Sequence, residues 1–195
     1  MSVSLDQIKE LRARTGAGVV DSKTALSESA GDVEAAIKWL RKKGKASAAK
    51  KAERLTREGV IASYVHSNSK IAVLVSVLCE TDFVARNEKF QQLAREIAMH
   101  IAAADPMVIN PDEVPKPEVE SERLLALEAA GAGNKPKEIQ DKIVAGKLKK
   151  FQEERSLLTQ PFVKDPGKTV GELIEAAVSE LGENITVGEF SRLKI

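Results

Sequence analysis

The pattern of apolar and polar positions predicts a β-hairpin over residues 59–79. Residues 71–79, IAVLVSVLC, are apolar at every position except Ser76. Such a Val-rich run is typical of a strand that is buried on both faces or nearly so. The segment GVIASYVH at 59–66 is also apolar and β-branched, and the SNSK that separates the two segments has turn chemistry.

Apolar residues at helical spacing follow this hairpin. In residues 87–104 they begin with Phe90, Leu93 and Ala94, and they predict a helix packed on the sheet. TVGELIEAAVSEL at 169–181 predicts a last helix, and the segment 184–193 predicts a final strand. The sheet is therefore expected to contain three strands in all.

Residues 4–43 predict three short helices. Ser4 and Gln7 have the spacing of a capping box at the start of the first helix. Gly16 can end that helix in the left-handed conformation, and Asp32 can cap the third helix. The result is a compact three-helix module whose core is marginal when it stands alone.

Residues 117–160 predict an antiparallel helical hairpin. ESERLLALEAA forms its first arm, Gly131, Gly133 and Asn134 interrupt the helix, and Pro136 opens the second arm. Narrow apolar stripes on otherwise charged helices suit a short coiled coil. The first arm's stripe is expected to contain Leu124, Leu125 and Leu127, and the second arm's stripe Ile139, Ile143, Val144, Leu148 and Phe151.

These elements define an α+β fold. A three-helix module with a basic linker occupies residues 1–54, and a core domain occupies residues 55–195. The core is expected to be a small antiparallel three-stranded sheet covered by helices, with the helical hairpin as an insertion.

Composition places the chain among soluble globular proteins. It has 195 residues, a formal net charge of +1 and a hydrophobic fraction of 43%, which argues against a disordered chain. The single cysteine, Cys79, excludes an internal disulfide, and we interpret it as a small buried hydrophobe. The start MSVSLDQIKEL lacks the features of a signal peptide, and no apolar run reaches membrane-spanning length. A reducing, cytoplasmic compartment and no membrane partner are the expectation.

Residues 41–57 contain eight basic side chains and one acid. This run is either a polar linker or an extension of the third helix. It could present a patch to RNA or phosphate. A solvated connector is the simpler interpretation, because no aromatic or Gly-rich element interleaves the charges. We therefore expect no specific nucleic-acid partner.

The sequence offers no catalytic or metal-binding constellation. His66 and His100 are the only histidines, and neither has a cysteine or carboxylate at metal spacing. A Gly-rich phosphate loop is also absent. We expect a protein that is not an enzyme and that needs neither a cofactor nor a metal.

The segment that follows the buried strand, Thr81, Asp82, Phe83 and Val84, allows two interpretations. Large apolar groups on a stiff strand-to-helix corner can serve as an anchor for a partner. Alternatively, Phe83 and Val84 belong to the core beneath the following helix, with Thr81 or Asp82 as its N-cap.

Three blocks of sequence resemble the elongation factor Ts family. They are TDFVARN followed by Phe90, the N-terminal KELRARTGAGVVDSKTALSESAGDVEAAIKWLRKKG, and NKPKEIQDKIVAGKLKKFQEERSLLTQPFVKDPGKTV. The resemblance implies a ubiquitin-associated-like N-terminal module. Longer members of the family have a core of two related subdomains, and only one such unit fits between Glu58 and Asp105. The chain thus resembles the short form of the family.

The resemblance implies a guanine nucleotide exchange factor. Such a factor would bind elongation factor Tu with GDP, promote GDP release by disturbing the magnesium and phosphate site, and stay bound to the nucleotide-free form until GTP binds. Thr81, Asp82, Phe83 and Val84 match the motif that the family associates with dislodging the magnesium ion. An auxiliary contact is expected from Arg12, Thr15, Gly16, Ala17, Gly18 and Val19.

Two further expectations concern partners. A three-stranded sheet with one poorly covered face should pair with a second copy across a two-fold axis, which predicts a homodimer through the core sheet. An RNA- or ribosome-associated protein that uses residues 41–57 is the alternative function. A ubiquitin-binding or general interaction module would explain residues 4–43 alone.

Overall fold

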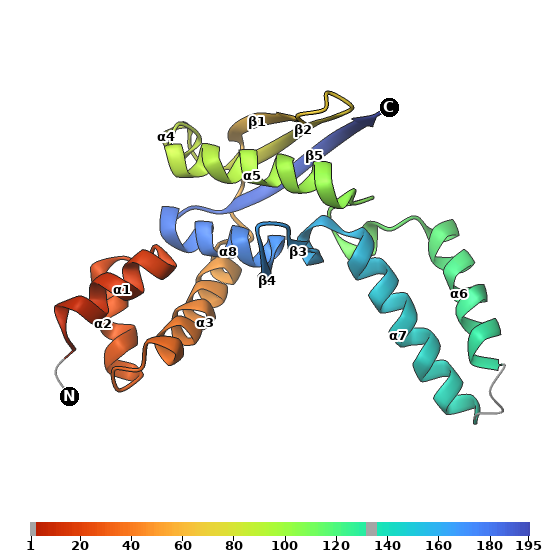
Figure 1. Cartoon of the computed structure of the whole chain (residues 1–195), viewed down its shortest axis with the longest axis horizontal. Coiled ribbons are helices and arrows are strands. Elements are labelled where there is room, and N and C mark those ends of the chain that lie inside the picture. Colours follow the sequence, from red (N-terminus) through yellow and green to blue (C-terminus); the bar gives the residue numbers. More distant parts are fainter. Residues whose placement is uncertain (1–2, 132–135) are drawn as a thin grey trace. The chain divides into compact units, whose positions relative to one another are not determined.

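The computed structural model describes residues 3–131 and 136–195 and confirms the α+β class (Figure 1). Its residues group into two compact units. The first unit comprises residues 1–61, 76–94 and 172–188, and the second comprises residues 62–75, 95–171 and 189–195. The predicted division of the chain into residues 1–54 and 55–195 stays a prediction.

The first unit begins with the three predicted helices, α1 (Leu5–Thr15), α2 (Val19–Glu28) and α3 (Val33–Lys51). The capping box of Ser4 and Gln7 is present, and the side chain of Asp32 caps α3. Gly16 ends α1 with φ 70°, in the left-handed region. Leu11, Ala25, Leu26 and Ala36 form a small buried core.

The basic run at 41–57 is helical up to Lys51, so the interpretation as an extension of the third helix is confirmed for that part. Its lysines make contacts within the first unit. Lys43 Nζ lies 2.8 Å from an Asp21 oxygen, and Lys45 Nζ lies 2.9 Å from a Glu172 oxygen. The extension therefore packs as a structural helix.

A three-stranded antiparallel sheet has the order β1 (Glu58–Val65), β2 (Ile71–Cys79), β5 (Ile185–Lys194). The apolar run predicted that β2 is buried on both faces or nearly so, but one of its faces is only partly covered. Val73, Val75, Val77 and Cys79 are buried, but Leu74 is 54% exposed. An apolar run predicts that a strand is buried, but it does not indicate which face of the strand is packed against other residues of the same chain.

Two helices follow β2, the single turn α4 (Asp82–Ala85) and the longer α5 (Glu88–Ala104). Figure 1 shows α5 running along the sheet. Its buried face begins with Phe90 in the first unit and continues with Ile97 in the second. The sequence predicted α5 within a residue of its start, whereas α4 is too short to give a periodic signal.

The second unit contains the predicted helical hairpin, formed by α6 (Lys116–Gly131) and α7 (Lys137–Arg155). The 3-10 turn η1 (Pro111–Glu113) precedes α6. Of the residues expected to interrupt the helix, Gly133 and Asn134 lie outside the described residues. The buried contact consists of Ala126, Ala130 and Val144.

Part of the apolar stripe that was expected on the hairpin faces solvent instead. Leu124, Leu125 and Ile139 are 58%, 59% and 47% exposed. At the contact between α6 and α7, α6 contributes the buried Ala126 and Ala130. The expected stripe residues Leu127, Ile143, Val144 and Leu148 also pack there, so that part of the stripe is confirmed.

The three strands expected for the main sheet are confirmed, but two further short strands, which form a separate sheet, were not predicted. β3 (Pro161–Phe162) follows the 3-10 turn η2 (Leu157–Thr159) and pairs antiparallel with β4 (Asp165–Thr169). Helix α8 (Val170–Leu181) then leads to β5. Strands of two and five residues are too short to show an alternating pattern.

Among the described residues, no helix combines the length and the apolar character needed to cross a membrane.

His100 on α5 lies fully buried in the second unit. The Val163 backbone N–H donates to its Nδ1 at 3.3 Å, and its Nε2 lies 3.0 Å from Gln160 Oε1. This arrangement requires the neutral ring with its proton on Nε2, which donates to Gln160. Burial lowers the pKa of His100, an effect that outweighs the hydrogen bond to Gln160.

The lowered pKa of His100 predicts a loss of stability in acid. The unfolded chain binds a proton at His100 below about pH 6.5, while the folded protein resists that proton. We expect the free energy of unfolding to fall by up to about 1.4 kcal/mol per pH unit below that pH. His100→Gln should remove this slope in denaturant titrations, and His66→Gln, at an exposed histidine, should keep it. Equal slopes in the wild type and His100→Gln would contradict the assignment.

Candidate partner-binding site

The candidate site is the corner where β2 ends and α4 begins. Thr81 is the N-cap of α4, with φ −128° and ψ 156°, and its hydroxyl oxygen accepts a hydrogen bond from the Val84 N–H at 3.4 Å. A hydroxyl at this position satisfies one of the backbone donors that a helix start leaves without an intrahelical partner. The expectation that Thr81 or Asp82 caps this helix is confirmed for Thr81.

Phe83 projects into solvent from α4. Its exposed fraction is 82%, whereas Val84 is half-buried and Ala85 is buried. The interpretation of Phe83 as a core residue is therefore wrong. A fully apolar ring exposed on one short turn is costly in water, which makes it a candidate contact for another molecule.

Asp82 forms an ion pair beside Phe83. Its Oδ2 lies 3.0 Å from Nη2 of Arg86, which is itself 80% exposed. The pair spans one helical turn and holds the carboxylate of Asp82 along α4. An exposed pair of this kind contributes little stability, so the carboxylate is available to a partner at small cost.

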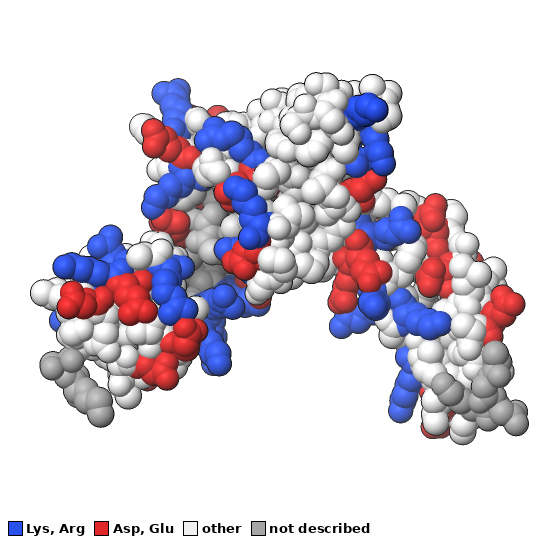
Figure 2. Space-filling view, viewed as in Figure 1, with Lys and Arg blue, Asp and Glu red and all other residues white. Residues whose placement is uncertain are grey.

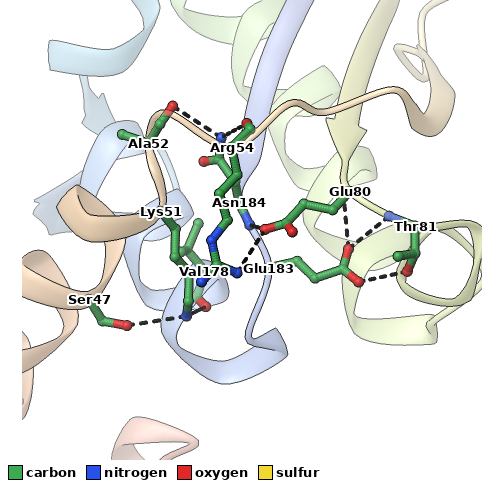
Figure 3. Close-up of polar contacts among 9 residues, drawn as sticks. All are labelled: Ser47, Lys51, Ala52, Arg54, Glu80, Thr81, Val178, Glu183 and Asn184. Carbon is green, nitrogen blue, oxygen red and sulfur yellow. Dashed lines mark hydrogen bonds and ion pairs between the residues drawn. The ribbon is translucent and has the colours of Figure 1, made fainter.

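Glu183, in the turn between α8 and β5, binds the backbone of the corner (Figure 3). One carboxylate oxygen accepts the N–H groups of Glu80 and Thr81 at 3.1 and 3.0 Å. The other oxygen accepts the hydroxyl proton of Thr81 at 2.6 Å. Three donors of the corner thus converge on one half-buried carboxylate.

The adjacent residue, Asn184, makes the reciprocal contact. Its backbone N–H donates to a carboxylate oxygen of Glu80 at 2.6 Å, and Arg54 Nη1 lies 3.5 Å from the same oxygen. The Asn184 side-chain amide donates to the carbonyl oxygens of Ala52 and Arg54 at 3.3 and 2.8 Å. The turn at 183–184 therefore connects the corner to the segment that follows α3.

Cys79 lies directly before the corner and is fully buried, as expected. Its thiol donates to the carbonyl oxygen of Thr81 at 3.2 Å. Burial raises the pKa of Cys79 to about 11, and the nearby negative charge of Glu183 acts in the same direction. The thiol is therefore neutral near pH 7, which makes it a packing group rather than a nucleophile.

The expected auxiliary contact comprises the end of α1, the loop that follows it and the first residue of α2. Arg12, Gly18 and Val19 are exposed, while Thr15 and Ala17 are half-buried. The Thr15 hydroxyl donates to the Leu11 carbonyl at 2.6 Å and accepts the Ala17 N–H at 3.3 Å. The loop is thus held in one shape by its own hydrogen bonds.

Glu180 on α8 lies against this loop. A Cβ added at Gly16 would lie 3.4 Å from Glu180 Oε2, and the positive φ of Gly16 also disfavours a side chain there. The other oxygen of Glu180 forms an ion pair with Lys89 at the start of α5. The end of α8 therefore borders both the auxiliary loop and the helix that follows the candidate corner.

Sequence reasoning missed Glu180, Glu183 and Asn184. Glu183 and Thr81 are 102 positions apart, so no local spacing connects them. The only available signal was the polar break GEN between α8 and β5, which also fits an ordinary turn. Among the described residues, no group of three His, Cys, Asp or Glu side chains could hold a metal ion.

Comparison with known proteins places these observations in a family. The model of the family described as "Elongation factor TS" matches residues 6–195. A protein of Herpetosiphon aurantiacus named elongation factor Ts is 49% identical over 195 residues, which are 100% of this chain and 98% of that protein. The protein of the same name from Rubrobacter xylanophilus is 48% identical over 195 residues, with both chains covered completely.

A longer relative also matches. The elongation factor Ts of Thermosynechococcus vestitus is 53% identical over 191 residues, which are 97% of this chain but 64% of that protein. The chain belongs to the elongation factor Ts family. It is accordingly a factor of translation elongation, and its length matches that of the shorter relatives.

Proposed function

We propose that this protein is a guanine nucleotide exchange factor for elongation factor Tu. It binds the GDP-bound form, promotes GDP release, and stays on the nucleotide-free form until GTP binds. Family membership supports the partner, and the observation that carries the mechanism is the 82% exposure of Phe83 on a corner held by the protein's own polar contacts. As a translation factor it would act in the cytoplasm.

Exchange requires differential binding and no bond-making by the factor itself. The factor must bind the nucleotide-free partner more tightly than the nucleotide-bound partner. By linkage, the nucleotide then weakens the factor's binding by the same ratio. The proposal therefore assigns the chain no catalytic residue of its own and no cofactor.

Phe83 is the proposed wedge. An aromatic side chain has only two rotatable torsions, so it can enter an apolar cleft between partner helices at small entropic cost. Thr81 and Val84 support the turn that carries the ring, and Asp82 offers a hydrogen-bond acceptor beside it. On binding, Asp82 could leave its ion pair with Arg86 and accept a hydrogen bond from the partner, which would fix the orientation of the corner on the partner.

The effect on the partner's magnesium ion is proposed to be indirect. Magnesium favours octahedral oxygen coordination and is usually held by one or two carboxylates together with phosphates and waters. Asp82 alone is a poor competitor for the ion. Phe83 would instead shift the partner's helices and thereby withdraw the groups that hold the magnesium ion and the β-phosphate.

The segment from Arg12 to Val19, which contains the loop between α1 and α2, is proposed as an auxiliary contact on the nucleotide domain of the partner. Its exposed Arg12, Gly18 and Val19, together with Thr15, Gly16 and Ala17, present a preformed surface. A preformed loop loses little conformational freedom on binding. This contact would supply affinity, while the corner would supply the exchange rate.

The alternative, an RNA-binding role for residues 41–57, has weaker support. Lys43, Lys45 and Arg54 form ion pairs with Asp21, Glu172 and Glu80, and Lys51 Nζ donates to the Val178 carbonyl. Figure 2 shows acidic and basic side chains interspersed on the face in view. A phosphate-binding surface would instead concentrate positive charge.

A homodimer through the core sheet is also proposed. Val65 on β1, Leu74 on β2 and Leu193 on β5 are 63%, 54% and 72% exposed, so three neighbouring strands each expose a large apolar side chain. A small sheet of this kind gains stability when a second copy covers it.

The wedge proposal predicts that Phe83→Ala uncouples binding from exchange. Stopped-flow release of a fluorescent GDP analogue from elongation factor Tu should accelerate to a plateau with rising wild-type concentration. With Phe83→Ala the plateau rate should fall at least about tenfold, while binding weakens by less than about 1.4 kcal/mol, because the auxiliary surfaces remain. Leu55→Ala, at another exposed apolar residue, is the matched control and should behave as wild type. A normal plateau rate for Phe83→Ala would refute the wedge.

The dimer proposal predicts a mass of twice 21.1 kDa in sedimentation at micromolar concentration. Leu74→Glu should shift the protein to the monomer, because it places a charge within the proposed apolar interface. Leu124→Glu, at an exposed leucine of α6, should leave the mass unchanged. The dimer would be contradicted if the free protein sediments only at 21.1 kDa and its complex contains one copy per partner molecule.

A further inference from the structure

The direction of Phe83 depends on residues outside the four-residue motif Thr81–Val84. Phe83 stands on α4, a helix of four residues. Four residues make barely one hydrogen-bonded turn, and a single turn is unstable in isolation because nucleation of a helix is unfavourable. The direction of Phe83 must therefore be fixed by groups outside α4.

Glu183 supplies three of the hydrogen bonds that fix α4. The N–H groups of Glu80 and Thr81 donate to its Oε2, and the Thr81 hydroxyl donates to its Oε1. The hydroxyl proton of Thr81 is thereby directed to Glu183, which leaves an oxygen lone pair for the Val84 N–H. Glu183 thus sets the orientation of the cap on which Phe83 depends.

The turn that carries Glu183 is itself held by hydrogen bonds of the neighbouring Asn184. Asn184 donates from its backbone to Glu80 and from its side chain to the carbonyls of Ala52 and Arg54. Figure 3 shows the side chains of Glu80 and Glu183 lying side by side between the corner at 80–81 and the turn at 183–184. The corner and the turn at 183–184 are therefore linked in both directions, so that rotation of α4 would break several bonds at once.

We propose that Glu183 is a positioning residue for nucleotide exchange, acting through Thr81 to hold Phe83 in the direction that enters the partner. This inference rests on the exchange function proposed above. It adds that the exchange rate depends on a carboxylate from the turn between α8 and β5, distant in sequence from the Thr81–Val84 motif. A merely structural role would lower stability without changing the mobility of Phe83 in the folded protein.

The first test measures the mobility of position 83 in the free chain, without any partner. Because the chain has a single tryptophan, Trp39, a Trp39→Phe, Phe83→Trp background carries one reporter at the corner. In time-resolved anisotropy, Glu183→Ala should raise the amplitude of nanosecond depolarisation about twofold. Glu172→Gln removes the charge of a carboxylate on α8 that pairs with Lys45, and it should leave the amplitude unchanged.

The second test separates rate from affinity with Phe83 intact. In GDP-release assays, Glu183→Ala should lower the maximal rate about tenfold and change the half-saturating concentration by less than about threefold, because misplacement of the wedge affects exchange more than docking. Glu183→Gln keeps an acceptor for the two backbone N–H groups but loses the acceptor for the Thr81 hydroxyl. It should give an intermediate rate, and it stands in for Glu183→Ala if that variant unfolds below the assay temperature.

The outcomes distinguish the two levels of the proposal. Wild-type protein that fails to accelerate GDP release refutes the exchange function, whatever the anisotropy shows. A wild-type protein that exchanges normally, with folded Glu183 variants of unchanged anisotropy and maximal rate, refutes the positioning role. A loss confined to the half-saturating concentration also refutes it, because that result identifies Glu183 as a direct contact with the partner.

Discussion

The carboxylate of Glu183 and the corner that it binds connect the parts of the first unit. Hydrogen bonds to a charged group stabilise a protein by about 1.5–3 kcal/mol each, and Glu183 accepts three of them from Glu80 and Thr81. Two of these donors are the backbone N–H groups of Glu80 and Thr81, and leaving such groups without partners is costly where they are withdrawn from water. The corner keeps its shape because one acidic side chain satisfies all three donors.

A rigid corner explains how Phe83 can be both exposed and directed. The strand before it is buried on one face, and the neutral thiol of Cys79 packs directly behind Thr81. The helix after it buries Phe90. Phe83 is therefore an apolar ring presented from an ordered base, and a partner that binds it gains apolar contact without first ordering the corner.

Local features of this fold could be predicted from the sequence, because their causes lie within a few residues. The capping box of Ser4 and Gln7, the cap at Asp32 and the end of α1 at Gly16 all depend on neighbours along the chain. The periodic apolar face of α5 is equally local. The four residues of the candidate site were predicted as a corner motif, and resemblance to a family supplied their proposed role.

The remaining features depend on contacts that no local pattern contains. The exposure of Phe83 follows from where α4 is held, and Glu183 holds it from 102 positions away. The exposed Leu74 occupies an apolar run that equally fits a buried strand. The stripe on α6 was misassigned at Leu124 and Leu125, because alanines form the contact with α7.

The proposed exchange function requires the chain to bind nucleotide-free elongation factor Tu more tightly than the GDP-bound form. Titration calorimetry of the chain against both forms, together with the GDP affinity of the partner with and without the chain, measures this preference. We expect tighter binding to the nucleotide-free form, and a GDP affinity lowered by the same ratio, as linkage requires. Equal affinity for the two forms, or an unchanged GDP affinity, would refute the exchange function.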